Sequence, residues 1–338
     1  MIRVSDNIDE ILESGWETFV LSQSKGSVFQ TPSMYRCYLK TEGHSPLVLG
    51  AFDGSDLVGV LMSDVMYERG FLKKKFTTRS VIMGGPVIKG DSPLILDALL
   101  SYYQANFTKQ VVYSQIRNQF DQLANNDVFQ KYGFRFEPHL NFIITLDSED
   151  KVWDRIGKGR KKQIKKAVKN GLTVRTFLPN EIPESLLSEC YSVIDVNYHR
   201  IGLPVADKEL FASARQEQIL VLFVVYDKDE HIIGCRMALG YNKCLYGWYA
   251  GSREQYYHLF PNDLLIWETL KWGVNNGYAF FDYGGAGNPN QPYGVREFKA
   301  QAGGILVDYG RYQCVHNQMK YFLGKIALRM YKMVKRLS

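Results

Sequence analysis

The chain has 338 residues, of which 46% are hydrophobic and 22% are charged, and this balance excludes a disordered protein. Its length suits two domains of roughly 150 residues better than one core. The formal net charge of +6 suits an anionic substrate or surface and is too small to indicate a nucleic-acid partner. No apolar run reaches the length of about 18 residues that a membrane-spanning helix needs, and the first residues lack the apolar core of a signal peptide. We therefore expect a cytoplasmic protein.

Cysteine and histidine usage argues against a metal enzyme. The five cysteines are scattered and form no CxxC pair, and the six histidines form no HxxxH pair. This pattern favours a reducing compartment and disfavours a structural zinc site or a disulfide framework. We expect no bound metal and no bound cofactor.

The first half of the chain starts with two predicted helices, residues 7–21 and 33–40. A hairpin follows, because Asp53 and Gly54 separate two alternating apolar runs. Its arms are residues 47–52 and 57–65. The remaining predicted elements are a strand at 80–84, a helix at 93–107, a strand at 111–116, a helix at 120–132 and a strand at 136–146.

The second half repeats this order of elements. The predictions are helices at 152–170 and 184–199, hairpin arms at 219–226 and 232–239, a strand at 244–250, a helix at 262–276, a strand at 279–283, a short helix at 293–300 and a strand at 304–312. A fixed order at an offset of about 170 residues indicates two copies of one fold.

The sequence therefore predicts an α/β (α+β) protein with two tandem domains, each a mixed, mainly antiparallel sheet flanked by helices. We place the domains at residues 1–147 and 148–315, with residues 316–338 as a C-terminal helix that packs on the first domain. The order of elements resembles that of GNAT-type acyltransferases, which is an analogy at the level of the fold.

A strongly basic helix opens the second half. Its seven basic residues between positions 158 and 169 lie mostly on one side, which is compatible with a solvated face. Arg160 instead falls on the apolar stripe between Ile156 and Ile164, where an unpaired charge is costly. Its planar guanidinium suits phosphate or carboxylate. Two interpretations stay open: Arg160 binds a substrate phosphate, or it forms a structural salt bridge.

A second candidate site follows the strand at residues 279–283. Asp282 stands at the carboxyl end of this strand, where α/β sheets usually bind ligands, and its carboxylate is able to orient or deprotonate an attacking amine. An aspartate that only caps the turn is equally compatible with the pattern. Gly284 and Gly285 allow the backbone to approach a ligand closely.

The stretch at residues 319–337 is amphipathic and basic. Its apolar positions include Phe322, Ile326 and Met330, and lysines and arginines lie between them. Such a helix is able to lie on an anionic membrane. A helix that packs on the first domain with its basic end exposed is the alternative.

Several segments, in this order, are similar to the FemAB family of peptidoglycan-bridge aminoacyltransferases and related acetyltransferases. They lie between about residues 27 and 305, and each is quoted as it stands in this sequence: SVFQTPSMY from Ser27, RKKQIKKA from Arg160, YGWYAGS from Tyr246, PNDLLIWE from Pro261, FDYGG from Phe281 and GVREFK from Gly294. The resemblance implies two acyltransferase-type domains. It also implies transfer of an amino acid from aminoacyl-tRNA to an amine of a peptidoglycan precursor, or of another acyl group in surface-polysaccharide or lipid pathways.

The resemblance assigns roles to further residues. The family places its Phe-Lys pair at the reaction centre, which here is Phe298 and Lys299, and a fixed cation there is able to stabilise an oxyanion. We expect Tyr246, Trp248 and Tyr249 to line the substrate groove. Several tRNA-using members also carry a long helical hairpin in the second domain, and this chain has no room for one.

The first functional hypothesis is an N-acyltransferase that uses aminoacyl-tRNA and acts on a phosphate-bearing cell-envelope precursor. No catalytic serine, P-loop or nucleophile motif is visible, so direct attack by the amine is expected. The second hypothesis replaces the donor by acyl-CoA or an acyl-carrier protein, although residues 253–261 lack the glycine-rich turn that usually cradles pyrophosphate. The third is a non-catalytic module that binds nucleic acid or membranes.

Overall fold

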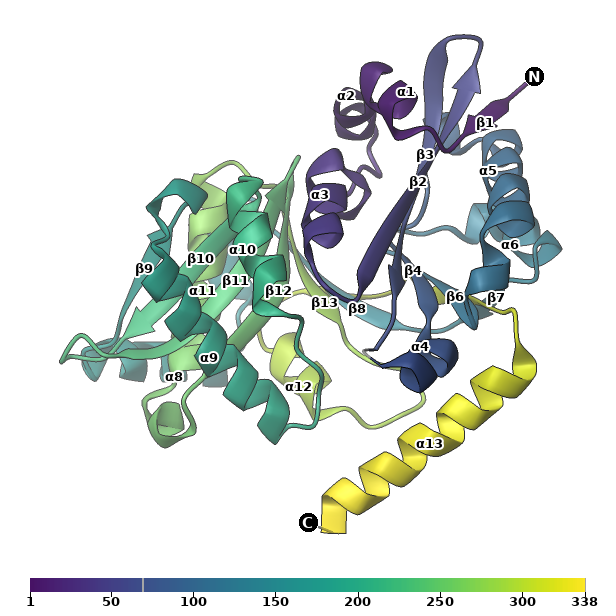
Figure 1. Cartoon of the computed structure of the whole chain (residues 1–338). Coiled ribbons are helices and arrows are strands. Elements are labelled where there is room, and N and C mark those ends of the chain that lie inside the picture. Colours follow the sequence, from purple (N-terminus) through teal and green to yellow (C-terminus); the bar gives the residue numbers. More distant parts are fainter. Residues whose placement is uncertain (69, 338) are drawn as a thin grey trace. The chain divides into compact units, whose positions relative to one another are not determined.

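The computed structural model describes residues 1–68 and 70–337. The chain divides into two compact units, one formed by Met1–Pro138 with the segment from Tyr309 onward, the other by His139–Asp308. Each unit contains a mixed, mainly antiparallel sheet with helices packed against it (Figure 1). The predicted fold class is thereby confirmed.

In the first unit, the described residues form a sheet with the path β1-β2-β3-β4-β6-β15-β7, and β5 pairs with β3. Among its described strands, only β4 and β6 pair in parallel. The strands are β1 Arg3–Ser5, β2 His44–Asp53, β3 Asp56–Met66, β4 Arg79–Met83, β5 Val87–Ile88, β6 Tyr113–Arg117, β7 Arg135–Glu137 and β15 Arg311–Val315. The helices are α1 Ile8–Glu13, α2 Trp16–Ser22, α3 Pro32–Lys40, α4 Phe71–Thr77, α5 Pro93–Asn106, α6 Asn126–Lys131 and α13 Gln318–Leu337.

In the second unit, the described strands follow the order β14-β8-β13-β12-β11-β10-β9, and only β12 and β13 pair in parallel. The strands are β8 Leu140–Thr145, β9 Thr173–Phe177, β10 Leu220–Tyr226, β11 Ile232–Tyr241, β12 Cys244–Ser252, β13 Phe280–Gly285 and β14 Ile305–Asp308. The helices are α7 Glu149–Arg155, α8 Lys158–Lys169, α9 Glu184–Arg200, α10 Lys208–Gln216, α11 Pro261–Asn275 and α12 Gly294–Ala300.

Two predicted helices are each split in two. The predicted helix at residues 7–21 breaks at Gly15, whose φ of +79° ends α1 and starts α2. The predicted helix at 152–170 breaks between α7 and α8, where Ile156 has an extended backbone and its neighbour Gly157 caps α8. The amide of Gly157 donates to the carbonyl of Gln301, so a tertiary contact holds this break. Helices α4 and α10 are absent from the sequence-based prediction.

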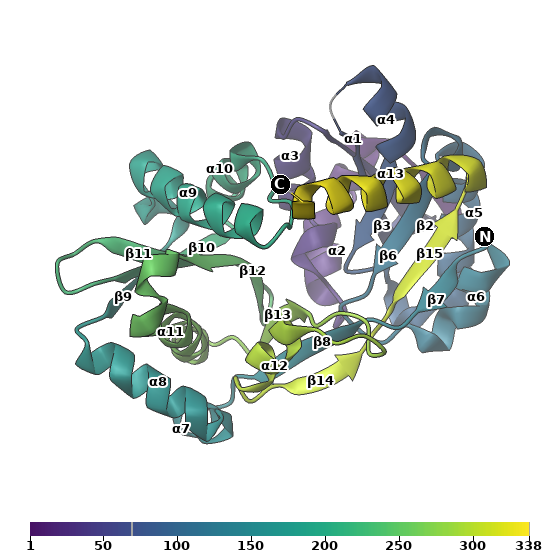
Figure 2. The ribbon, with the colours of Figure 1, turned by 90° about the horizontal axis from the view of Figure 1, so that it is seen from below.

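Two predicted strands also break, and their halves join different sheets. The predicted strand at 136–146 stops at Pro138, which cannot donate a ladder hydrogen bond, so β7 stays in the first sheet while β8 pairs with β13 and β14. The predicted strand at 304–312 stops at Gly310, where φ is +62°. After this turn β15 lies between β6 and β7 in the first sheet (Figure 2). The chain therefore leaves the first unit after Pro138 and returns to it after Asp308, whereas the sequence-based division lies at residues 147 and 315.

Each sheet buries apolar side chains on both faces. In the second unit, one face packs against α7, α8 and α11 through a cluster that includes Ile164, Phe223, Leu265 and Phe281. The other face meets α9, which approaches β12 closely because Gly251 of β12 has no side chain. Strand β10 is buried along its whole length, as expected for a strand covered on both sides. This packed sheet positions the residues of the candidate site.

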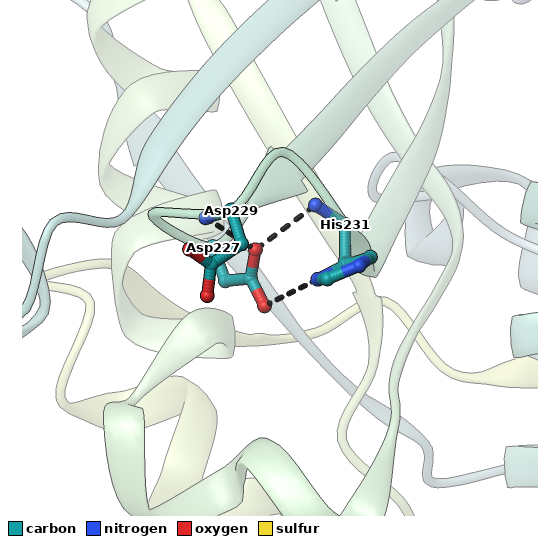
Figure 3. Close-up of side chains that lie close together, drawn as sticks. All are labelled: Asp227, Asp229 and His231. Atoms are coloured by element: carbon teal, nitrogen blue, oxygen red, sulfur yellow. Dashed lines mark hydrogen bonds and ion pairs between the residues drawn. The ribbon is translucent and has the colours of Figure 1, made fainter.

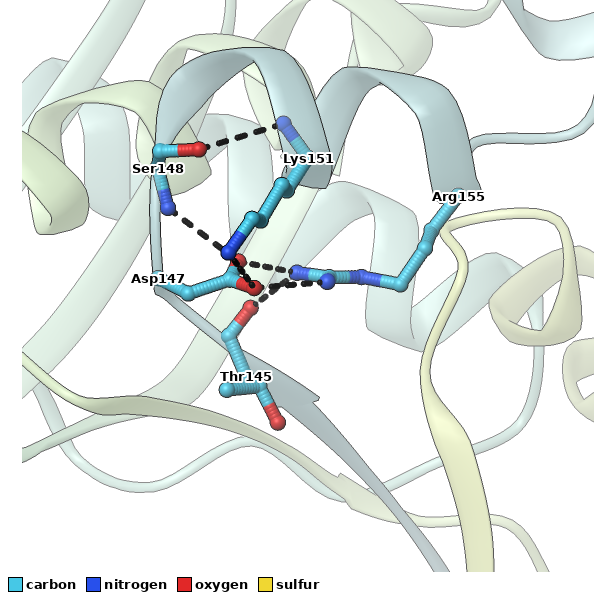
Figure 4. Close-up of polar contacts among 5 residues, drawn as sticks. All are labelled: Thr145, Asp147, Ser148, Lys151 and Arg155. Carbon is cyan, nitrogen blue, oxygen red and sulfur yellow. Dashed lines mark hydrogen bonds and ion pairs between the residues drawn. The ribbon is translucent and has the colours of Figure 1, made fainter.

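An ion-pair cluster ties the end of β8 to α7 (Figure 4). Asp147 accepts two hydrogen bonds from Arg155, at 2.6 and 3.0 Å, and Arg155 also donates to the carbonyl of Thr145. Asp147 lies beside Ser148, which caps the first turn of α7. The guanidinium of Arg155 holds the pKa of Asp147 well below its usual range.

Replacement of Asp147 by Asn should lower the melting temperature of the second unit at pH 7, because the bidentate pair is lost. A depressed carboxylate pKa stabilises the fold above the unfolded value of about 4, and this contribution disappears as the pH falls through the folded value. The difference between wild type and D147N should therefore shrink steadily as the pH falls below about 4. Thermal melts between pH 2 and 7 check this, with Lys151→Gln, 4.0 Å from Asp147, as the control that should change little. A constant difference across this range would contradict the assignment.

Candidate active site

The candidate site lies where β12 and β13 separate. These strands pair in parallel only from Cys244 to Tyr246 and from Phe280 to Asp282. Beyond this point β12 carries a bulge and β13 shifts its register against β8. The carboxyl ends of the two strands therefore diverge at a position where open sheets commonly bind ligands.

Lys299 reaches this point from α12. Its Nζ donates to the carbonyl oxygens of Tyr283 and Gly285, the second at 3.0 Å, and lies 4.9 Å from the centre of the Tyr283 ring. Burial lowers the pKa of Lys299 to about 8, and the charge of Asp282 partly opposes this shift. Two backbone acceptors thus fix an ammonium group at the end of β13, and it keeps one N–H for a ligand.

Asp282 is buried, with 2% of its surface exposed. Its Oδ1 accepts a hydrogen bond of 2.7 Å from the amide of Gly284. The carboxylate therefore caps the turn, as one of the two interpretations of the sequence expects. The charge of Asp282 acts on Lys299, so the structure also brings these two predicted catalytic residues together.

Gly284 lies between two polar groups. A β-carbon at this position would lie 3.6 Å from Tyr246 Oη and 3.7 Å from Lys299 Nζ, and the φ of +72° also disfavours any other residue. At Gly285 a β-carbon would come within 2.9 Å of His139 Nε2. The bare backbone of the two glycines lets the polar groups converge on the end of β13.

Trp248 and Tyr249 belong to an aromatic cluster. The bulge in β12 adds Trp248 between residues that pair with β11, so these two consecutive side chains both contact Phe211, each at a ring separation of 5.0 Å. Tyr249 also packs against Tyr198 of α9 at 5.3 Å. Of the predicted aromatic residues, Tyr246 lies with Lys299 around Gly284, whereas Trp248 and Tyr249 pack under α9 and α10.

Arg160 forms a buried ion pair with Asp263. Its side chain is 1% exposed, and Nε donates to Asp263 Oδ1 at 2.9 Å. The guanidinium carbon lies 4.0 Å from the centre of the Phe298 ring. Nη1 and Nη2 are buried without a hydrogen-bond partner among the described residues. The salt bridge expected by one interpretation is present, and the two Nη groups keep donors that an anion would satisfy.

Arg236 also acts on Lys299, although the sequence pattern did not predict it as a site residue. It lies in the middle of β11, is 5% exposed and makes one polar contact within the described chain, 3.4 Å from Nη2 to Tyr283 Oη. Its Nε is buried without a partner. The charge of Arg236 contributes to the lowered pKa of Lys299, after the larger effect of burial. The sequence feature that indicates a special role for Arg236 is its place as the single charged residue in the apolar run at residues 232–239.

One group of side chains in the described residues has the spacing of metal ligands, namely Asp227, Asp229 and His231 in the turn between β10 and β11 (Figure 3). Oδ1 of Asp227 accepts hydrogen bonds from the amides of Asp229 and His231, both at 2.9 Å. Oδ2 lies 3.2 Å from Nδ1 of His231. These three contacts give the carboxylate of Asp227 a structural role in the hairpin turn.

The C-terminal helix α13 exposes a row of apolar side chains that includes Met319, Phe322 and Leu323. Its first turns pack on the first unit, where Gln313 donates to the hydroxyl of Tyr321 at 2.8 Å. The predicted basic positions at 329, 332, 335 and 336 have side chains outside the described part of the chain. Among the described helices, none combines the length and apolar character that spanning a membrane would require.

Comparison with known proteins identifies part of the chain. Residues 206–299 match the family model of the acetyltransferase (GNAT) domain, a range that ends at Lys299. No curated protein sequence matches the chain.

Similar solved structures extend the likeness to both units. FemX has a TM-score of 0.72 at 14% identity, with 95% of this chain and 99% of FemX covered. L-PGS from Bacillus licheniformis has a TM-score of 0.60 at 16% identity, with 92% and 95% covered. A tandem GNAT protein from the clavulanic acid biosynthesis pathway has a TM-score of 0.57 at 11% identity, with 94% and 99% covered. At these identities the structures share the fold. The chain therefore carries a GNAT acetyltransferase domain at residues 206–299 and shares its tandem fold with FemX, which supports an acyltransferase.

Proposed function

We propose that the chain is an N-acyltransferase of FemAB type, which transfers an aminoacyl or acyl group to an amine of a cell-wall or cell-envelope precursor. The amine nitrogen attacks the carbonyl carbon of an ester or thioester, and a new C–N bond forms. The C–O or C–S bond then breaks, and the amine proton leaves with the alcohol or thiol product. No covalent enzyme intermediate is needed, because the nucleophile is the acceptor itself.

The observation that carries this proposal is the fixed ammonium group of Lys299. Its two backbone acceptors hold it beside Gly284 and Tyr246, where the parallel strands separate. In the proposed reaction Lys299 stabilises the oxyanion that forms as the carbonyl is attacked. Asp282 orients the attacking amine or accepts its proton, while Tyr246, Phe298 and the two glycines contact the substrate. Trp248 and Tyr249, which pack against Phe211, line the same substrate groove farther from Lys299.

Aminoacyl-tRNA is the favoured donor, and acyl-CoA or an acyl-carrier protein is the alternative. The turn before α11, residues 253–261, lacks the glycines that usually bring backbone amides around a pyrophosphate, which disfavours the usual CoA arrangement. The alternative is favoured by the match to the GNAT acetyltransferase family model. The Nη groups of Arg160 are the candidate contact for a phosphate of the acceptor.

Ligand-induced stabilisation distinguishes the two donors. A ligand that binds the folded state raises the melting temperature, by about 2.7 kcal/mol of stabilisation at 100 times its Kd. We expect a stabilised aminoacyl-adenosine amide, which mimics the end of a charged tRNA, to raise the melting temperature, and acetyl-CoA to leave it unchanged. Stabilisation by acetyl-CoA alone would move the assignment to the alternative donor. Free CoA and adenosine serve as controls for non-specific binding.

The proposed location of the protein is the cytoplasm, where α13 contacts the inner face of the membrane. Phe322, Leu323 and Met330 are exposed on this helix, and the sequence places lysines and arginines between them. An apolar row with basic neighbours suits an anionic lipid surface. The acceptor would then be lipid-linked or processed close to the membrane.

A further inference from the structure

Arg236 carries a buried positive charge without a carboxylate partner. Its side chain comes from the middle of β11, and no acidic group of the described residues forms a salt bridge with it. Leaving such a charge inside a protein is costly unless it is paired. Nε has no hydrogen-bond partner, and the contact from Nη2 to Tyr283 Oη is long at 3.4 Å.

The surroundings of Arg236 are built from aromatic rings. The guanidinium carbon lies 5.1 Å from the ring centre of Tyr283 and 5.9 Å from that of Phe281. A β-carbon on Gly247 would lie 3.4 Å from Nη1, so the glycine leaves room beside the guanidinium. Burial raises the pKa of Tyr198, and the charge of Arg236 opposes this rise, which places the α9 tyrosine within its electrostatic reach.

The charges near Lys299 do not cancel. Arg236 and Lys299 both act on this region as cations, and Asp282 is the anion that acts on Lys299. With Lys299 protonated, the three groups sum to one positive charge. The single negative charge of one carboxylate would neutralise this positive charge, whereas the two negative charges of a phosphate dianion would leave the site negative. The planar guanidinium also matches the two oxygens of a carboxylate.

We propose that Arg236 binds a carboxylate group of the amine substrate. This inference rests on the proposed N-acyl transfer and narrows its acceptor to amines that carry a carboxylate, such as an amino acid or a peptide with a free carboxyl group. Arg236 fixes the orientation of the acceptor from β11, and Lys299 acts at the carbonyl of the donor from α12.

Carboxylate binding is measured first without any donor, so that the result does not depend on turnover. The probe is acetate, observed through saturation transfer to its methyl group by NMR, with acetamide as the neutral isostere. Wild type should bind acetate and should not bind acetamide. R236Q should weaken acetate binding at least tenfold, about 1.4 kcal/mol. R236K keeps the positive charge but loses the paired N–H donors of the guanidinium, so its affinity for acetate should be intermediate. If R236Q does not fold, R236K alone tests the proposal.

The matched control is R175Q, which removes an exposed arginine of the same unit and should leave acetate binding unchanged. Equal acetate binding by wild type, R236Q and R236K would overturn the proposal, as would equal binding of acetate and acetamide. Tenfold tighter binding of inorganic phosphate than of acetate would overturn the choice of a carboxylate.

A second arm tests the substrate class during turnover. Wild type should acylate amino acids with a lower KM than the corresponding amino-acid amides, and R236Q should raise the KM for the acids alone. If no amine is acylated while acetate binding still depends on Arg236, the proposed reaction fails and the binding site stands. If both kinds of amine are acylated with equal KM by wild type and R236Q, the reaction stands and this inference fails.

Discussion

Replacement of Lys299 by Met is expected to lower kcat by about 10²–10³-fold, the usual cost of removing one preorganised oxyanion donor. The substitution removes the ammonium group and keeps most of the apolar stem, so α12 should retain its packing. Burial already lowers the pKa of Lys299 to about 8, which means that its charge is held at a cost in stability. K299M should therefore raise the free energy of unfolding at pH 7 while activity falls.

The sign of the pH dependence tests the role of Lys299. A protonated lysine stabilises an oxyanion, so kcat should fall as the pH rises through about 8. In K299R this alkaline limb should disappear, because the guanidinium stays charged. A rate that rises through pH 8 would instead identify Lys299 as a base. Lys162→Met, an exposed lysine on α8, is the control that should keep wild-type rates and stability.

The stability gained in K299M should also depend on pH. A lysine whose folded pKa is depressed destabilises the protein fully below that value, and the penalty disappears as the pH approaches the unfolded value of about 10.4. Chemical denaturation at pH 7 and at pH 10 should therefore give a smaller difference at the higher pH. Loss of both activity and stability in K299M would show a structural role instead.

Breaking the Arg160–Asp263 pair is expected to reduce the free energy of unfolding by about 3–5 kcal/mol. R160M leaves the carboxylate of Asp263 inside the protein, where burial already raises its pKa despite the attraction of Arg160. D263L leaves the guanidinium without its ion pair and should be similarly costly. R160M also removes the cation above the Phe298 ring, which precedes Lys299.

The double variant R160M/D263L separates structural and substrate roles. Because neither buried charge remains, at least half of the lost stability should return. If the Nη groups of Arg160 hold a substrate phosphate, the stable double variant should still show a raised KM for the acceptor. R175M, which breaks the exposed pair with Glu230, should cost less than about 1 kcal/mol. A fully active double variant would limit Arg160 to a structural role.

The order of elements could be predicted from the sequence because local patterns determine it. Asp53 and Gly54 turn a hairpin, and the apolar runs on either side form β2 and β3 with nearly the expected bounds. Arg160 was also recognised as unusual, since a charge on the apolar stripe of a helix needs a partner. The sequence left that partner open, and the structure supplies Asp263, which lies more than one hundred residues later.

The exchange of strands between the sheets is decided by tertiary structure. Pro138 and Gly310 break their predicted strands, but local patterns do not say which sheet each half joins. The side chains around Arg236 likewise come from β12, β13 and α9, which meet only in the folded chain. By itself the sequence determined the fold class, the duplication and the reaction-centre candidates Asp282 and Lys299. Only the tertiary structure decided which cations and aromatic rings surround them, because burial and charge pairing depend on contacts between distant segments.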